Sequence, residues 1–123
     1  MRVHVVVVGK VRSPLQEAVS EYEARAARYW KFAVTEVDAG SRGKGGREDP
    51  AAIRAAEGER LRTALAAAGR VVALTREGRA MSSPELARFM DECALGSVRE
   101  VAFVVGGAFG LDPEIVRAAH RRV

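Results

Sequence analysis

The chain has 123 residues, the length of one ordinary domain, and we expect a single domain over residues 1–123. Its 48% of hydrophobic residues, single cysteine and short apolar runs exclude a disordered chain, a disulfide framework and a membrane span, and they favour a protein of the reduced cytoplasm. The net charge of +4 mildly favours a polyanionic partner, although 17 of the 20 basic residues are arginine, a bias that a GC-rich genome would also produce.

The first half of the chain predicts two strands, each followed by a helix. Residues 3–8 are nearly all apolar, as in a strand buried on both faces, whereas residues 33–37 alternate, as at a sheet edge. Ser13–Pro14 and Asp49–Pro50 predict helix starts, because the N–H that proline lacks would have no partner there. Ser13 and Gln16 also have the spacing of a capping box. The apolar residues are Leu15, Ala18, Val19, Tyr22, Ala26 and Tyr29 in the first helix, and Ile53, Leu61, Leu65 and Ala68, interrupted by Gly58, in the second.

The second half of the chain repeats this order. Residues 71–74 and 101–105 are short apolar runs that predict two further buried strands. Ser83–Pro84 and Asp112–Pro113 predict the start of the helix that follows each of them. The apolar positions are Leu86, Phe89, Met90 and Cys93 in the third helix, a clean i, i+3, i+4, i+7 repeat, and Leu111, Ile115 and Ala119 in the fourth.

This alternation of strand and helix predicts an α/β fold with a mainly parallel sheet, helices on both faces and right-handed crossovers. In an open parallel sheet, ligands bind beyond the carboxyl ends of the strands. The loops 39–48, 75–82 and 106–111 follow the second, third and fourth strands, so we expect them to gather at that edge. A ligand site is therefore predicted among these loops.

The loop after the fourth strand contains Gly106, Gly107 and Gly110. Glycine accepts positive φ and has no Cβ that would separate the backbone from a ligand. The turn is a candidate cofactor cleft, but a glycine pattern of this kind taken alone favours the alternative, a tight strand-to-helix turn without a ligand. Its spacing differs from the dinucleotide-binding fingerprint, and no Walker lysine follows it, which disfavours a nucleotide phosphatase.

The loop after the second strand is rich in glycine and basic residues, with the sequence SRGKGGR at 41–47. Arg42, Lys44 and Arg47 give it a positive charge that attracts phosphates without requiring a fixed shape. An RNA-binding loop and an ordinary solvated loop are equally compatible with this composition.

Candidate catalytic groups are few. His4 lies in the first predicted strand and His120 on the last predicted helix, so their spacing does not indicate a metal site. Cys93 falls on an apolar helix face and is explained as a core residue. The other candidates also have structural explanations, namely Ser82 and Ser83 as helix caps and Tyr29 and Trp30 as core or interface aromatics. The residues alone predict a cofactor cleft without a metal and leave the catalytic group unknown.

Four segments, in their order and spacing, resemble the RlmH (YbeA) family of SPOUT-class methyltransferases, which modify large-subunit ribosomal RNA. They are MRVHVVVVGKVRSP at the start, DAGSRGKG at 38–45, VVALTREGRAMSSPELA at 71–87 and VVGGAFGL at 104–111. The resemblance covers essentially the whole chain. It implies N3-methylation of a pseudouridine in 23S rRNA, with S-adenosylmethionine as the donor, by a homodimer with a trefoil-knotted cofactor site.

By position, the resemblance carries cofactor contacts to Leu74 and Gly106, with Thr75, Gly107 and Gly110 in the same motifs. It also implies that the basic loop faces RNA. The family usually has aspartate where this chain has Thr75, and it continues past residue 123 with a strand, a threaded loop and a helix. We therefore expect the knot, the pocket and the dimer surface to be incomplete in these residues, with reduced cover over Phe103 and Val105.

Two other functions stay open at this point. A catalytically inactive, dimeric RNA- or ribosome-binding module on the same scaffold fits Thr75 and the short C-terminus. A generic nucleotide-binding α/β domain fits the fold alone.

Overall fold

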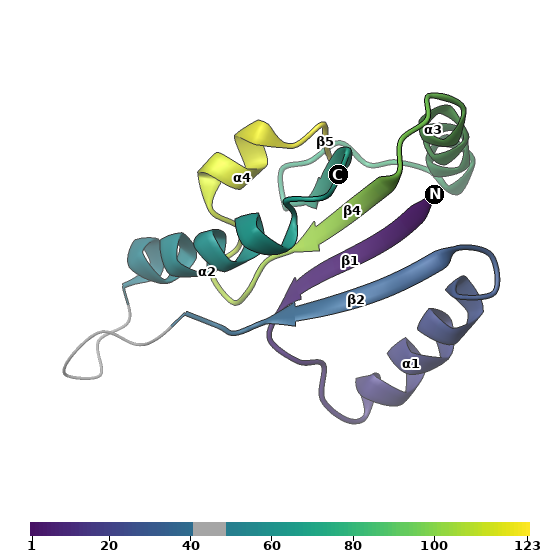
Figure 1. Ribbon diagram of the computed structural model, residues 1–123. Helices are drawn as coiled ribbons and strands as arrows, with labels where there is room; N and C mark the ends of the chain where they lie inside the picture. Colours follow the sequence, from purple (N-terminus) through teal and green to yellow (C-terminus); the bar gives the residue numbers. More distant parts are fainter. Residues whose placement is uncertain (41–48) are drawn as a thin grey trace.

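A computed structural model describes residues 1–40 and 49–123, and it confirms the α/β fold (Figure 1). The elements are β1 (Arg2–Val8), α1 (Leu15–Ala26), β2 (Lys31–Val37), α2 (Pro50–Ala64), β3 (Arg70–Leu74), α3 (Ser83–Leu95), β4 (Glu100–Val105), α4 (Pro113–Ala118) and β5 (Arg121–Arg122). The strands form one sheet in the order β2-β1-β4-β3-β5, and every pair is parallel. All four predicted strands are confirmed, and β2 lies at an edge, as its alternating pattern indicates.

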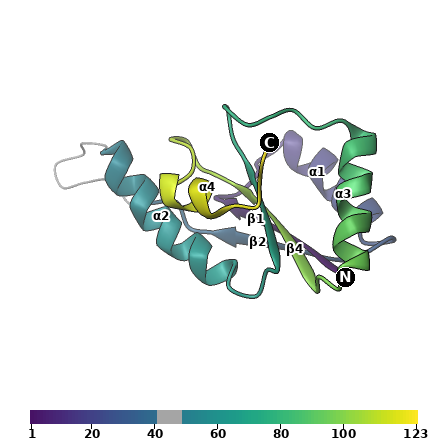
Figure 2. The ribbon, with the colours of Figure 1, turned by 90° about the horizontal axis from the view of Figure 1, so that it is seen from above.

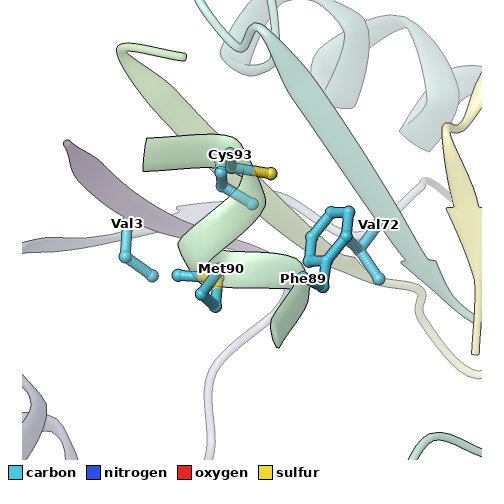
Figure 3. Close-up of a cluster of buried hydrophobic side chains, with 6 residues drawn as sticks. Val3, Val72, Phe89, Met90 and Cys93 are labelled. Carbon is cyan, nitrogen blue, oxygen red and sulfur yellow. The ribbon is translucent and has the colours of Figure 1, made fainter. Parts of the chain in front are cut away.

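Helices cover both faces of the sheet (Figure 2). On one face, Phe89, Met90 and Cys93 of α3 pack against Val3 and Val72 of the strands (Figure 3). This confirms Cys93 as a core residue, and burial raises the pKa of its thiol. On the other face, α2 and α4 pack on the sheet through a second cluster made of Val6, Leu61, Ala73, Val104, Ile115 and Ala119.

Two of the four predicted helix starts have the expected cap, and a third is capped one residue earlier than Ser83–Pro84 predicts, so Ser83 as a cap is wrong. The Asp49 carboxylate accepts hydrogen bonds from the amides of Ala51 and Ala52, at 3.2 and 3.4 Å. Ser82 and Glu85 form a reciprocal capping box at the start of α3, so Ser82 is the cap and Ser83 is the first helical residue. Asp112 accepts from the amide of Glu114 at 3.0 Å. Each cap satisfies amides that have no partner within the helix.

Helix α1 differs from the prediction in its start and in its cover. Pro14 occupies the N-cap position, and no side chain caps the helix, so the predicted capping box of Ser13 and Gln16 is wrong. The predicted apolar face is also uncovered: no residue of α1 is buried, and Tyr22 is 67% exposed. Tyr29, which is 79% exposed, is likewise not a core aromatic. In Figure 1, α1 projects beside the edge strand β2 instead of lying flat on the sheet.

The last residues form a short strand that the sequence analysis missed. Helix α4 ends at Ala118, and β5 pairs with the outer edge of β3. His120 therefore lies after the last helix and not on it, where its amide donates to the Val71 carbonyl at 2.9 Å. A strand of two arginines carries no apolar pattern from which it could be recognised. Phe103 and Val105 are half-buried, as expected for positions with incomplete cover.

Gly58 explains why the apolar face of α2 is interrupted. A Cβ at this position would lie 2.8 Å from the Asp112 Cβ and would overlap its carboxylate, so glycine lets α4 start directly against α2. We expect Gly58→Ala to destabilise the fold by roughly 1–2 kcal/mol, since the overlap outweighs a gain of about 1 kcal/mol in helix propensity. Urea unfolding measures this change.

A matched control for Gly58→Ala is Ala55→Gly on the exposed side of the same helix. There alanine is expected to be the better residue by about 1 kcal/mol, so the preference has the opposite sign. A stabilised Gly58→Ala variant would contradict the packing argument.

In the described parts of the chain, no helix is both long enough and apolar enough to cross a membrane.

Candidate functional site

A pocket of about 650 Å³ lies at the carboxyl ends of β3 and β4. Two of the three predicted loops meet there: the segment after β3 forms one wall and the glycine turn after β4 forms the other. Five lining residues are those singled out from the sequence, namely Leu74, Thr75, Gly106, Gly107 and Gly110. The structure brings them together because β3 and β4 are neighbours that end at the same register, with Leu74 opposite Val105.

The glycine turn folds back on its own backbone. The Gly110 amide donates to the Gly107 carbonyl at 3.1 Å, and Gly110 has a positive φ of 84°. A Cβ on Gly106 would lie 2.7 Å from the carbonyl carbon of Gly110 and 2.9 Å from the Leu111 nitrogen. Gly106 is therefore required so that the turn can close, a reason different from the open approach to a ligand that the sequence suggested.

The turn also presents backbone donors. Among residues 1–40 and 49–123, the amides of Ala108 and Phe109 donate no hydrogen bond to a protein acceptor, and both residues line the pocket. Backbone N–H groups normally have a partner, in the protein or in solvent. These two amides are therefore available to polar atoms of a ligand.

The opposite wall is shaped by the last residues of the chain. The Thr75 amide donates to the Val123 carbonyl at 2.7 Å, and the Arg79 amide donates to the Arg122 carbonyl at 3.0 Å. Gly78 lies so close to this segment that a Cβ there would meet the Val123 nitrogen at 2.6 Å. The loop after β3 thus wraps around residues 122–123, and Leu74 keeps 40% of its surface exposed at the pocket.

The pocket is also lined by three charged side chains that the sequence analysis did not single out. Arg54 reaches across from α2, and its Nη1 donates to the Phe109 carbonyl at 3.4 Å. Arg76 and Glu77 lie in the loop after β3. Arg54 could not be found from the sequence, because nothing in its helix spacing shows that this side of α2 faces the glycine turn.

The predicted RNA-binding residues Arg42, Lys44 and Arg47 lie outside the described residues. The chain can be followed to Gly40, whose amide donates to the Glu57 carboxylate at 2.8 Å. This contact places Gly40 near the base of the glycine turn, because Glu57 also lies against Gly107.

Neither histidine belongs to the pocket. His4 is buried near the amino ends of the strands, where its Nε2 lies 2.6 Å from the Thr35 hydroxyl and its Nδ1 lies 3.6 Å from the Glu100 carboxylate. His120 accepts a hydrogen bond from the Val71 amide through Nδ1 at 3.0 Å. In the described ranges, no three histidine, cysteine or acidic side chains are grouped as metal ligands.

The pocket fits a nucleoside-sized ligand. Its volume is in the range of about 300–1,000 Å³ that small-molecule sites occupy. Leu74 and Val105 offer apolar contact to a flat base, and the amides of Ala108 and Phe109 offer donors to its heteroatoms. The residues present therefore match an adenosyl group, which needs shape, apolar contact and a few backbone hydrogen bonds.

Comparison with known proteins gives results that agree with this site. A family model described as "Predicted SPOUT methyltransferase" matches residues 1–123. The "Ribosomal RNA large subunit methyltransferase H" of Gemmatimonas aurantiaca is 42% identical over 130 residues, which cover 100% of this chain and 78% of that protein. Proteins of the same name from Symbiobacterium thermophilum and Geotalea daltonii are 39% and 36% identical, and the matches cover 97% and 100% of this chain and 76% and 78% of theirs.

Proposed function

The chain belongs to the SPOUT methyltransferase family, and from this premise we propose that it methylates N3 of a pseudouridine in 23S ribosomal RNA with S-adenosylmethionine as the donor. The observation that supports the donor site is the pocket in which Leu74 and Thr75 face the glycine turn. Residues 1–123 would act as one domain in the cytoplasm, with the ribosome or its RNA as the partner.

In this proposal the donor supplies an electrophilic methyl group on its sulfonium, and the chain supplies position. The amides of Ala108 and Phe109 would hold the adenosyl group, and Leu74 and Val105 would pack against its base. Holding the donor and the accepting nitrogen in line replaces a bimolecular encounter with an oriented one, which is a large source of rate enhancement. No residue is assigned as the base that removes the N3 proton.

RNA would approach from the side of the basic loop. Arg42, Lys44 and Arg47 give this segment of the sequence a positive charge, and Arg54 and Arg76 add two guanidinium groups at the pocket. Phosphate contacts of this kind provide affinity and orientation without reading sequence. The choice of one pseudouridine would then depend on the shape of the RNA presented to the pocket.

We propose that the working form is a homodimer. An apolar groove of about 600 Å³ lies beside α3, lined by Trp30, Phe32, Leu86 and Met90 among others. The neighbouring helix α1 has no buried residue, and its Leu15 is 66% exposed. A second copy would remove this apolar surface from water. Sedimentation velocity is expected to give a mass twice that of the chain; a single-chain mass would contradict the dimer.

Transfer of a labelled methyl group tests the function directly. The protein is incubated with tritiated S-adenosylmethionine and with ribosomes or 23S RNA from a strain that lacks this modification, and the RNA is digested to nucleosides. The expected product is one labelled nucleoside, N3-methylpseudouridine. Binding of RNA without label, both with and without donor, would instead support the inactive RNA-binding module.

A further inference from the structure

Glu57 is a buried carboxylate that lies behind the pocket wall. It is on α2, only 3% exposed, and its Oε2 accepts a hydrogen bond from the Gly40 amide at 2.8 Å. Its Oε1 has no hydrogen-bond partner among the described residues. A buried carboxylate oxygen without a partner costs free energy, so this side chain is not explained by its contribution to helix stability.

The same carboxylate lies against the glycine turn. A Cβ on Gly107 would be 2.9 Å from Glu57 Oε1 and 3.1 Å from Oε2, and on its other side it would be 3.0 Å from a methyl group of Val8. The space that a side chain at 107 would need is thus occupied by Glu57 and by the end of β1. Gly107 is glycine because the turn rests directly on this carboxylate.

These two contacts connect segments that are distant in the sequence. Gly40 follows β2, Gly107 follows β4, and β1 lies between these two strands in the sheet. Glu57 therefore spans the end of β1 and joins Gly40 to the base of the pocket wall. One side chain fixes the positions of both segments relative to each other.

We propose that Glu57 is a positioning residue, which holds the glycine turn in the conformation that binds the methyl donor. It does not line the pocket, so it acts through Gly107 and not by touching the ligand. That the ligand held by this turn is the methyl donor rests on the proposed function. The effect of Glu57 on the turn is independent of the identity of the ligand.

The test compares Glu57→Ala and Glu57→Gln with Glu59→Ala, which removes the same charge from an exposed site on the same helix. Titration calorimetry measures the affinity for S-adenosylhomocysteine. We expect Glu57→Ala to weaken binding about tenfold, because the turn loses its support and must be ordered by the ligand. Glu57→Gln keeps the volume and one oxygen acceptor, so it should stay within about threefold of the parent protein, as should Glu59→Ala.

A second variant approaches the contact from the turn. Gly107→Ala pushes against the carboxylate and is expected to weaken binding in the parent protein. In a Glu57→Ala background the two carboxylate oxygens are gone and the contact with Val8 remains, so the cost of the same substitution should fall. Non-additivity of the two changes would measure the contact directly, and additivity would argue against it.

Hydrogen exchange on the ligand-free protein separates this proposal from the proposed function. Glu57→Ala should accelerate exchange in residues 104–112, whereas Glu57→Gln and Glu59→Ala should not. If the parent protein binds no S-adenosylhomocysteine, the function fails and exchange alone decides the role of Glu57. Parent-like binding and exchange in Glu57→Ala would overturn the proposal, as would equal losses in Glu57→Ala and Glu57→Gln, which would assign the effect to charge.

Discussion

Replacing Gly106 by valine is expected to abolish measurable binding of S-adenosylhomocysteine, a loss of about 100-fold or more in affinity. A Cβ at this position would be 2.7 Å from the carbonyl carbon and 2.9 Å from the carbonyl oxygen of Gly110, and 2.9 Å from the Leu111 nitrogen. All three atoms belong to the backbone, so no side-chain rotation relieves the overlap. The turn must open, and its amides then leave the pocket wall.

Calorimetric titration and the ligand-induced shift in melting temperature measure the effect of Gly106→Val. Gly69→Ala is a suitable control, because a Cβ there would meet a Val98 methyl at 3.2 Å and no backbone atom closer than 3.6 Å. Gly69 immediately precedes β3, at the opposite end of that strand from Leu74. Both variants should stay folded, and only Gly106→Val should lose the ligand response. Normal binding by Gly106→Val would remove the glycine turn from the site.

Replacing Leu61 by alanine is expected to lower the free energy of unfolding by about 3 kcal/mol. Leu61 is 1% exposed and packs between α2 and the sheet, against the cluster that includes Val6 and Val104. The loss combines the transfer of the missing methyl groups with the cavity that they leave. It is a large part of a total stability of roughly 5–15 kcal/mol for a domain of this kind.

Leu95→Ala is the matched control for Leu61→Ala. Leu95 ends α3 and is 87% exposed, so the same truncation should change the free energy of unfolding by less than about 0.5 kcal/mol. Urea unfolding of both variants gives the comparison. Similar midpoints for the two would contradict the assignment of the α2 face to the core.

Local patterns in the sequence predict the strands and helices well. The runs at 3–8, 71–74 and 101–105 are inner strands because both of their faces are apolar, and 33–37 is an edge strand because its pattern alternates. The Asp49, Ser82 and Asp112 caps could be predicted because capping is a contact between residues two or three positions apart. The meeting of Leu74 with Gly106 followed from a general property of parallel sheets.

Long-range features that do not follow from the general geometry of a parallel sheet could not be predicted. The periodicity of α1 predicts a helix but not whether anything covers it, and nothing in the described chain buries Leu15 or Tyr22. The strand β5 is defined only by its pairing with β3. Glu57 and Arg54 occupy α2 positions whose importance becomes visible only when the glycine turn is placed beside them.

The central claim is that the pocket between Leu74 and the glycine turn holds the methyl donor. A crystal structure of the protein with S-adenosylhomocysteine tests it most directly. We predict that the adenine lies against Leu74 and Val105, with its polar atoms bound by the amides of Ala108 and Phe109. Density for the ligand anywhere else, with this pocket filled only by solvent, would contradict the account.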